Sequence, residues 1–236
     1  MKIAICSDIH GNQYALNNFF KDIETQKIDK VLFLGDVFGY YYGQKECLQK
    51  LMESNKAYCI KGNHDQYFLD LKKNPAIISN LVTKYGSSYA NTSQITPEQV
   101  KFISSLPLYV EMTLDSLKLF FCHGSLDNYL EGRVYPDSKI ENEKLYCKYD
   151  FVFLGHTHHK MVKLLNNTVV CNPGSLGQQR DGLGCSYVVF DTLTKVIHYK
   201  TVVFDVDSLS KEVELKDPSM SKLKEVLFRV NSNHNE

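Results

Sequence analysis

The first sixty residues alternate between short apolar runs and longer segments in which apolar residues have a helical spacing. The segments 2–8, 31–34 and 57–60 have the length and continuity of strands buried on both faces. Residues 13–25 and 44–54 lie between them and repeat their apolar side chains every three or four positions, which is typical of an amphipathic helix. This order of strand, helix, strand, helix and strand predicts right-handed crossovers and a parallel sheet.

The middle of the chain changes from helical to strand-like patterns. Residues 66–106 are predicted to be largely helical, and Thr-Pro-Glu-Gln at 96–99 is typical of a helix start, with the threonine as cap. A β-hairpin is predicted over 108–122. Residues 138–147 begin with the capping-box pattern Ser-x-x-Glu and are predicted to form a helix, followed by a strand at 151–154.

The C-terminal part is rich in strand patterns up to residue 204 and helical beyond it. Strands are expected at 161–165, 168–171, 186–191 and 195–204. We expect 1–236 to form a single domain, with a motif-bearing core at 1–204 and a helical extension at 205–236. The extension contains an amphipathic helix at 217–228 and frayed residues at 231–236. An α/β half followed by a β-rich half predicts a four-layer αββα sandwich of two mixed β-sheets flanked by helices.

Composition and charge are those of a soluble globular protein, with 43% hydrophobic and 23% charged residues. The charges of the 27 basic and 27 acidic residues cancel, which argues against a protein that binds nucleic acid through a positive surface. The balance does not exclude a local basic groove. No apolar run approaches the ~20 residues of a membrane span, and the start of the chain is too short for a signal peptide. The seven cysteines lack C-x-x-C spacing, and we interpret them as reduced thiols. We therefore expect a cytoplasmic protein.

Five of the apolar runs lead directly into side chains that can bind a metal ion. Parallel strands present such residues at one edge of a sheet, where α/β folds bind their ligands. The alternative is a scatter of capping and core polar residues, which a single buried histidine or aspartate usually is. Five strands in succession disfavour that alternative, because a dry cluster of carboxylates and imidazoles is costly without an ion. The residues are Asp8 and His10, Asp36, Asn63 with His64, His123, and His156 with His158.

The mixture of ligand types indicates the ion chemistry. Imidazole, carboxylate and amide groups without thiolate suit Mn²⁺, Fe²⁺ or Zn²⁺. Leaving His64 aside, the set contains more ligands than one ion needs, and two ions bridged by one carboxylate would use them all. Such a pair, ~3.5–4 Å apart, clamps the attacking and leaving oxygens of a displacement at phosphorus. We expect two divalent ions, with Mn²⁺ favoured and Fe²⁺, Zn²⁺ or Ni²⁺ as alternatives.

In order and spacing, the motifs resemble those of the calcineurin-like metallophosphoesterases over about residues 1 to 200. The Asn-Pro-Gly-Ser loop at 172–175 is similar to that of the small bacterial and archaeal branch. The resemblance implies a first metal held by Asp8, His10 and His158, a second held by Asn63, His123 and His156, and Asp36 as the bridge between them.

The same resemblance implies the chemistry at the centre. A metal-bridging hydroxide attacks phosphorus, His64 acts as general acid near the leaving oxygen, and Asp65 orients or polarises His64. Serine/threonine protein phosphatases and dinucleoside tetraphosphate hydrolases carry the motif Gly-Asp-x-Val-Asp-Arg-Gly at the position of Asp36. This chain lacks the arginine of that motif. This departure weakens both of those assignments.

Three residues outside the motifs are candidates for substrate binding. Arg180 and Arg133 follow metal motifs, and an arginine fork suits a phosphate that is not transferred; the alternative for each is a solvated loop charge. Tyr40 could stack on a base, or pack on neighbouring helices. His159 and His198 read as structural or surface residues.

The leading interpretation is a dimetal phosphoesterase acting on a small phosphorylated, nucleotide-type substrate, as phosphodiesterase or phosphatase. Alternatives are a dinucleoside polyphosphate hydrolase or protein phosphatase, a nuclease, and a non-catalytic binding module. The neutral composition disfavours the nuclease, and the full ligand set disfavours the binding module. No membrane partner is expected, and homo-oligomerisation stays open.

Overall fold

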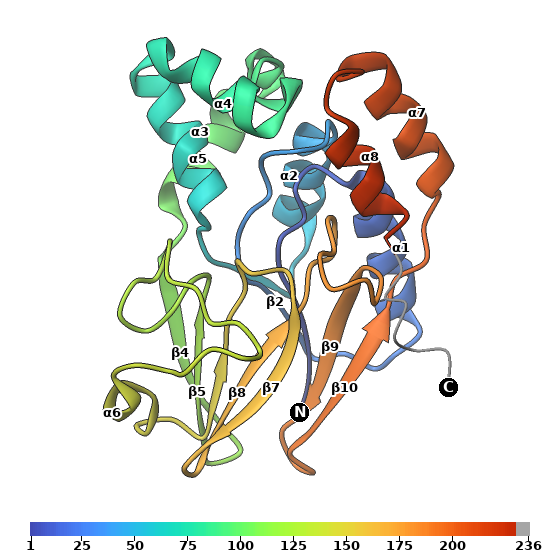
Figure 1. Cartoon of the computed structure of the whole chain (residues 1–236). Helices are drawn as coiled ribbons and strands as arrows, with labels where there is room; N and C mark the ends of the chain where they lie inside the picture. The colour runs from blue at the N-terminus through green and yellow to red at the C-terminus, as the bar shows by residue number, and fades with distance from the viewer. Residues whose placement is uncertain (230–236) are drawn as a thin grey trace.

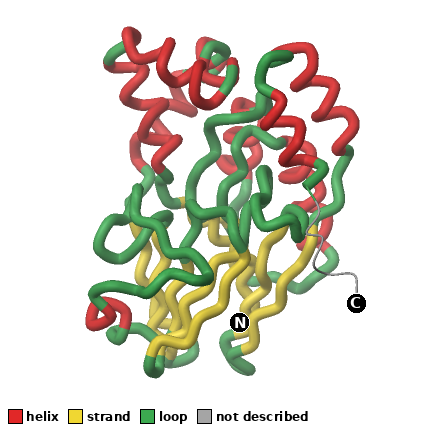
Figure 2. The backbone as a smooth tube through the Cα atoms, viewed as in Figure 1, coloured by secondary structure: helices red, strands yellow, loops and turns green. Residues whose placement is uncertain are grey.

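The computed structural model describes residues 1–229 and contains two five-stranded mixed β-sheets. Most helices gather at one end of the molecule, over the sheets (Figures 1 and 2). The first sheet has the strand order β10-β9-β1-β2-β3 and the second the order β4-β5-β6-β8-β7. The first consists of β1 (Lys2–Cys6), β2 (Lys30–Phe33), β3 (Ala57–Cys59), β9 (Ser186–Asp191) and β10 (Val196–Thr201). The second consists of β4 (Tyr109–Leu114), β5 (Leu117–Cys122), β6 (Phe151–Phe153), β7 (Lys160–Leu165) and β8 (Thr168–Pro173).

The helices fall into three groups along the chain. Two cross over between the parallel strands β1, β2 and β3, a larger group follows β3, and the last two form the C-terminal extension. The α-helices are α1 (Gln13–Glu24), α2 (Gln44–Glu53), α3 (Asn63–Lys73), α4 (Ile78–Tyr85), α5 (Pro97–Ser105), α6 (Glu143–Tyr146), α7 (Val206–Lys216) and α8 (Ser221–Leu227). Short 3-10 turns are η1 (Pro75–Ile77), η2 (Ser87–Tyr89) and η3 (Thr92–Gln94).

The alternation of side chains along β1 shows how the layers form. Ile3 and Ile5 lie between the two sheets, where they belong to the same hydrophobic cluster as Phe121 and Phe153 of the second sheet. Ala4 and Cys6 point to the opposite face and join the cluster that contains the helices. Successive side chains of a strand point to opposite faces, so a continuous apolar run is what a strand between two layers requires.

The predicted αββα sandwich is confirmed, and its outer layer over the second sheet is mostly loop. Phe120, Cys122 and Val152 pack there against residues of the segment 124–150, including Tyr146 of α6. The parallel pairing of β1 with β2 and of β2 with β3 is confirmed as well. No helix among residues 1–229 has the length and apolar character needed to cross a membrane.

The helix predicted over 138–147 is wrong in most of its length. Only Glu143–Tyr146 is α-helical, and Asn142 before it has a left-handed backbone, with φ of 51°. The Ser138 hydroxyl accepts the Tyr135 N–H at 3.0 Å and the Ser138 N–H donates to the Tyr135 carbonyl at 3.1 Å, which closes a turn. Serine side chains serve such turns as readily as helix caps.

Other boundaries follow the sequence more closely. The Thr96 cap of α5 is confirmed, because its hydroxyl accepts the Gln99 N–H while the Gln99 side chain accepts the Thr96 N–H. The last predicted strand ends at Thr201, earlier than expected, and the helix predicted over 217–228 begins only at Ser221. The residues predicted to be frayed, 231–236, lie outside the described residues.

Candidate metal centre

Each of the predicted metal ligands leaves the carboxyl end of a strand or begins the helix after it. The two sheets bring these ends together, so that residues from five strands share one buried site. The segments that carry the ligands follow β1, β2, β3, β5 and β6, and the side chains are those of Asp8, His10, Asp36, Asn63, His123, His156 and His158.

Five of these ligands have a left-handed backbone. Such a conformation is uncommon for residues other than glycine and costs roughly 1–3 kcal/mol each where the structure holds it. It lets the chain turn sharply at a strand end, so that both side chains of an Asp-x-His or His-x-His pair reach the same site. The φ angles are 57° at Asp8, 49° at His10, 61° at Asp36, 66° at His156 and 61° at His158.

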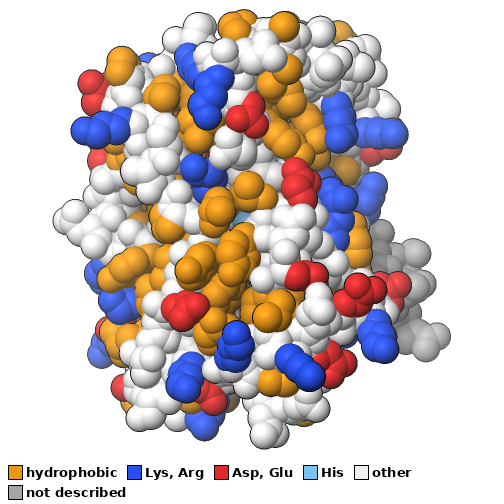
Figure 3. All heavy atoms as spheres, turned by 90° about the vertical axis from the view of Figure 1, so that its left-hand side faces the viewer, with side chains coloured by type: hydrophobic (Ala, Val, Ile, Leu, Met, Phe, Trp, Pro, Cys, Tyr) orange, Lys and Arg blue, Asp and Glu red, His pale blue; other side chains and the backbone are white. Residues whose placement is uncertain are grey.

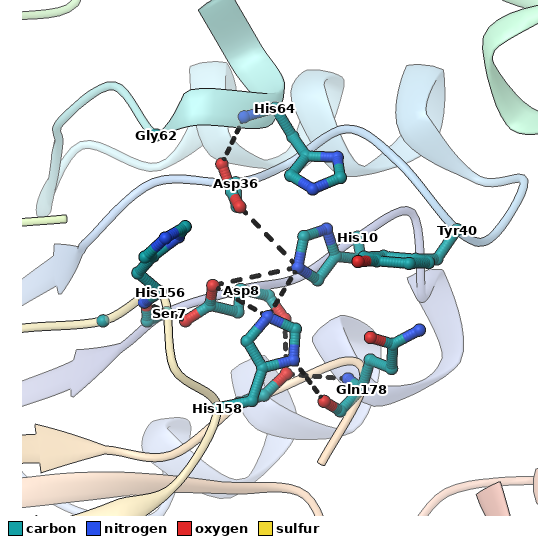
Figure 4. Close-up of polar contacts among 12 residues, drawn as sticks. Ser7, Asp8, His10, Asp36, Tyr40, Gly62, His64, His156, His158 and Gln178 are labelled. Carbon is teal, nitrogen blue, oxygen red and sulfur yellow. Dashed lines mark hydrogen bonds and ion pairs between the residues drawn. The ribbon is translucent and has the colours of Figure 1, made fainter. Parts of the chain in front are cut away.

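The first group of ligand atoms belongs to Asp8, His10 and His158 (Figure 4). The Nε2 atom of His158 lies 3.2 Å from Asp8 Oδ1 and 3.0 Å from His10 Nε2. Asp8 Oδ1 also lies 3.8 Å from His10 Nε2. All three side chains are nearly or completely buried. The predicted first ligand set is therefore brought together around one point.

The second group is formed by Asp36, Asn63, His123 and His156. Asp36 Oδ2 lies 3.3 Å from His123 Nε2, which in turn lies 3.0 Å from Asn63 Oδ1. The His123 and His156 rings are 5.0 Å apart. Asp36 Oδ2 is also 3.7 Å from His10 Nε2 of the first group. Asp36 thus lies between the two groups, as a bridging carboxylate must.

Backbone carbonyls fix three of the imidazole rings. The Nδ1 atom of His10 lies 2.6 Å from the Phe38 carbonyl oxygen, that of His158 lies 2.6 Å from Gln178 O, and that of His123 lies 2.7 Å from Leu34 O. Only a protonated Nδ1 can donate to these oxygens, so Nε2 is the nitrogen that each ring presents to the site. Metal-binding histidines are held in this way.

Two observations support the fit of cations to this site. Asp8 Oδ1 and His156 Nε2 are buried and lack a hydrogen-bond partner among the described residues. The backbone also approaches the ligands closely, because a Cβ atom at Gly62 would lie 2.1 Å from Asp36 Oδ1. The donor set of carboxylates, imidazoles and an amide suits divalent ions such as Mn²⁺, Fe²⁺ and Zn²⁺. Such ions would satisfy groups that are otherwise costly to bury.

Burial and mutual charge shift the pKa values of the ligands in the metal-free protein. Burial lowers the pKa of His10 and lowers that of His156 to about 3, which keeps both imidazoles in the neutral, metal-binding form. Burial raises the pKa of Asp36 to about 7. For His123 burial alone would lower the pKa, but the Asp36 carboxylate beside it raises the pKa to about 10. Asp36 and His123 therefore share a proton that an ion would displace.

His64 lies at the edge of this cluster, on the first turn of α3. Its ring is 4.9 Å from that of His10, and one of its nitrogens lies within 4.8 Å of ligand atoms of His10 and Asp36. Its Nδ1 atom lies 2.8 Å from the Tyr89 hydroxyl. In Figure 4 the ring points from α3 toward His10.

The Asp65 carboxylate has a different place from the one the resemblance implied. It accepts the backbone N–H groups of Gly62, Asp36 and Val37, each at 2.9 Å. None of the hydrogen bonds within residues 1–229 joins it to the His64 ring. Asp65 thus ties the start of α3 to the loop that carries Asp36, and we propose a positioning role for it in place of one toward His64.

The three substrate candidates differ in their surroundings. Arg180 Nη2 donates to the Tyr40 hydroxyl at 2.8 Å and to Gln178 Oε1 at 3.1 Å, and the Tyr40 ring lies 4.7 Å from that of His10. Arg180 and Tyr40 therefore lie beside the first ligand group. Arg133 is exposed on the loop that follows His123, and its side chain has no hydrogen bond or ion pair within the described part of the chain.

Tyr89 is the site residue that sequence reasoning missed. It lies 25 positions after His64, in the segment predicted only as largely helical, and its contact with His64 depends on how that segment folds back. The chain carries 15 tyrosines, so the residue type alone is no signal.

The family model of the calcineurin-like phosphoesterase superfamily domain matches residues 1–195. The chain belongs to this superfamily. It is 29% identical over 230 residues to an uncharacterized protein of Methanocaldococcus jannaschii, covering 89% of this chain and 91% of that one. It is 20% identical to a phosphodiesterase of the same organism, over 74% of this chain and 83% of that one.

The fold is also similar to that of a solved structure, a hypothetical protein from Pyrococcus horikoshii, with a TM-score of 0.81, 18% identity and 98% of each chain covered. The superfamily and the His/Asp cluster together make the protein a metal-dependent phosphoester hydrolase of the metallophosphoesterase class.

Proposed function

We propose that this phosphoesterase hydrolyses a phosphoester or phosphoanhydride bond of a small, nucleotide-type substrate, with His64 donating a proton to the leaving oxygen. The observation that supports this most directly is the buried cluster of seven ligand side chains with one further histidine beside it. The His64 ring is hydrogen-bonded to Tyr89, and its backbone N–H donates to the Asp36 carboxylate. His64 belongs to neither of the two ligand groups that the resemblance implies. It is therefore available for proton transfer.

The proposed roles divide between the ions and the chain. Two divalent ions held by the seven ligands would polarise the phosphoryl group and activate water. The chain fixes the ligands through backbone carbonyls, and Asp65 holds the loop of Asp36. Near the first ligand group, the Arg180 guanidinium would bind a phosphate that is not transferred, and Tyr40 would pack against a base or ring; the Arg180–Tyr40 contact beside His10 supports this.

This aromatic and basic surrounding supports a small, nucleotide-type substrate. On the face shown in Figure 3, hydrophobic side chains gather around the point where a histidine is visible. Such a border suits a planar group better than a protein surface or a long nucleic acid, and the formal net charge of zero agrees. The relative named as a phosphodiesterase supports a diester, with Arg133 as a second, more distant phosphate contact.

We also propose Mn²⁺ as the physiological ion and the cytoplasm as the location. The ligand set has the oxygen and imidazole donors that Mn²⁺ accepts. All seven cysteines are free thiols, which supports a reducing compartment.

The test is hydrolysis by metal-stripped protein with and without added Mn²⁺. Substrates are bis-p-nitrophenyl phosphate, p-nitrophenyl phosphate, a diadenosine polyphosphate and a short RNA. We expect Mn²⁺-dependent turnover of a small ester that falls roughly 100-fold or more in His64→Ala, as loss of an acid catalyst does. His198→Ala, which removes an exposed histidine of β10, is the control and should be unchanged. Turnover of RNA alone would indicate a nuclease, and no turnover with both ions bound would indicate a binding module.

A further inference from the structure

We propose that Tyr89 is a positioning residue that holds the His64 imidazole with Nδ1 facing away from the metal centre and Nε2 facing the reacting oxygen. The proposal rests on the proposed function, because it assigns Tyr89 a role only through His64. Tyr89 ends the 3-10 turn η2, which follows α4 in the helical group above the site (Figure 1).

The geometry around the Tyr89 hydroxyl determines which atom donates. The hydroxyl oxygen lies 2.8 Å from His64 Nδ1 and 3.3 Å from the His64 carbonyl oxygen. A tyrosine hydroxyl has a single proton, and a carbonyl oxygen can only accept. The hydroxyl therefore donates to the carbonyl and accepts from His64 Nδ1–H. This leaves Nε2 as the nitrogen that takes up a second proton from solvent, and the doubly protonated ring donates that proton to the leaving oxygen.

Neighbouring groups prevent the ring from turning away from this position. Gly39 passes so close that a Cβ atom there would lie 2.3 Å from His64 Nδ1. The Tyr85 ring packs edge-on against the imidazole, with centroids 4.4 Å apart. His64 and Tyr89 are 4% and 1% exposed, so water does not compete for the Nδ1 proton. The Tyr89 hydroxyl is the polar partner in this enclosure.

The turn that carries Tyr89 is itself attached to the C-terminal extension. The Asp217 carboxylate accepts the Ser87 N–H at 2.9 Å and the Ser87 hydroxyl at 2.9 Å. It also accepts the Tyr42 hydroxyl at 2.7 Å. Asp217 lies beyond the residues matched by the superfamily model, so a segment outside that match fixes the position of Tyr89. A buried carboxylate with several donors is a rigid anchor.

The first test compares aryl esters that differ in their need for a proton. Phenolate is a poor leaving group and needs protonation, whereas 2,4-dinitrophenolate leaves as the anion. In Tyr89→Phe we expect kcat for the phenyl ester to fall about 10-fold, part of what general acid catalysis contributes. Turnover of the dinitrophenyl ester should be unchanged, and it shows that the variant is folded and metal-loaded. Tyr109→Phe is the matched control, since Tyr109 is exposed on β4 and none of the hydrogen bonds in the described chain involves its hydroxyl, and it should leave both rates unchanged.

The second test needs no turnover. In the full chain labelled with ¹⁵N-histidine, the His64 Nδ1–H should give a slowly exchanging proton resonance, assigned by its loss in His64→Ala. Tyr89→Phe should remove or shift this resonance, and Tyr109→Phe should keep it.

The results separate the two proposals. If His64→Ala slows the phenyl ester selectively while Tyr89→Phe changes neither the rate nor the resonance, the role of Tyr89 is overturned. Equal losses on both esters in Tyr89→Phe would also overturn it, because they indicate a purely structural residue. If His64→Ala has no selective effect, the proposed function of His64 fails instead, and the role assigned to Tyr89 fails with it.

Discussion

The Nε2 atoms of His10 and His158 lie 3.0 Å apart, although the two residues are 148 positions apart in the chain. Each ring donates its Nδ1 proton to a backbone carbonyl, so two nitrogen lone pairs face each other. Burial lowers the pKa of both imidazoles, which disfavours a shared proton. A divalent cation bound to both nitrogens removes the repulsion, and this pair is therefore the clearest structural reason for a metal site.

Loss of one of these nitrogen ligands should remove most of the folding stability that the protein gains from bound metal. In the wild-type protein, Mn²⁺ at 100 times its Kd should stabilise the fold by about 2.7 kcal/mol relative to protein in EDTA. His158→Ala should lose most of this gain, because the first ligand group is then incomplete. Thermal unfolding with and without Mn²⁺ measures the effect, with His198→Ala as control. A Tm for the wild-type protein that does not respond to Mn²⁺ or other divalent ions would contradict the account.

Metal binding should release protons near neutral pH. In the metal-free protein the pKa of Asp36 is raised to about 7 and that of His123 to about 10, so the pair still holds a proton at pH 7. A metal ion needs both groups deprotonated, and its apparent affinity should therefore rise with pH, about tenfold per unit while one proton is displaced. Calorimetric titration in buffers of different ionisation enthalpy counts the protons. Binding with no proton release between pH 6 and 8 would be inconsistent with this pair.

Arg180 should matter for substrates with a second phosphate. Its guanidinium lies beside the first ligand group, on Tyr40, and a charged hydrogen bond of this kind contributes about 1.5–3 kcal/mol. Arg180→Gln should therefore raise KM for a diadenosine polyphosphate roughly 10-fold or more, with little change for p-nitrophenyl phosphate. Arg133→Gln, which alters an exposed arginine, should have a smaller effect. Steady-state kinetics of both variants decide, and an equal effect on both substrates would speak against a role in recognition.

Asp217 should connect the C-terminal extension to the core. We propose that residues 205–229 unfold together with the core as one unit. The Asp217 carboxylate accepts hydrogen bonds from Ser87 and Tyr42, and in Asp217→Asn one of its oxygens becomes an NH₂ group that can only donate. This change should lower the free energy of unfolding by about 1–3 kcal/mol. Denaturant unfolding should show one transition shifted to lower concentration. Glu225→Gln on the exposed face of α8 should leave it unchanged, and a separate early transition in the wild-type protein would argue against a single unit.

The metal centre could be predicted from the sequence because its residues sit at fixed places relative to strands. Asp8, Asp36 and His123 each follow a buried apolar run, and the carboxyl ends of parallel strands meet at one edge. The left-handed backbone at His156 and His158 is what local sequence does not reveal. That conformation is imposed by the packing around the site rather than by residue preference.

Features that depend on tertiary contacts were out of reach of the sequence. The contact of Tyr89 with His64 requires the fold of the whole helical segment 63–105, and the anchor at Asp217 requires the C-terminal helices. The pattern at Ser138 fits either a helix cap or a turn, and the chain uses the turn. Asp65 was expected to orient or polarise His64, and its carboxylate accepts backbone N–H groups of the neighbouring loop.

The central claim is that seven side chains form a two-ion centre that hydrolyses phosphoesters. The most direct measurement is turnover of bis-p-nitrophenyl phosphate while Mn²⁺ is titrated into metal-stripped protein, with bound metal counted at each point. The account predicts that activity rises until two ions are bound per chain and that Asp36→Asn abolishes the rise. Full activity with one ion bound, or no activity with two, would contradict it.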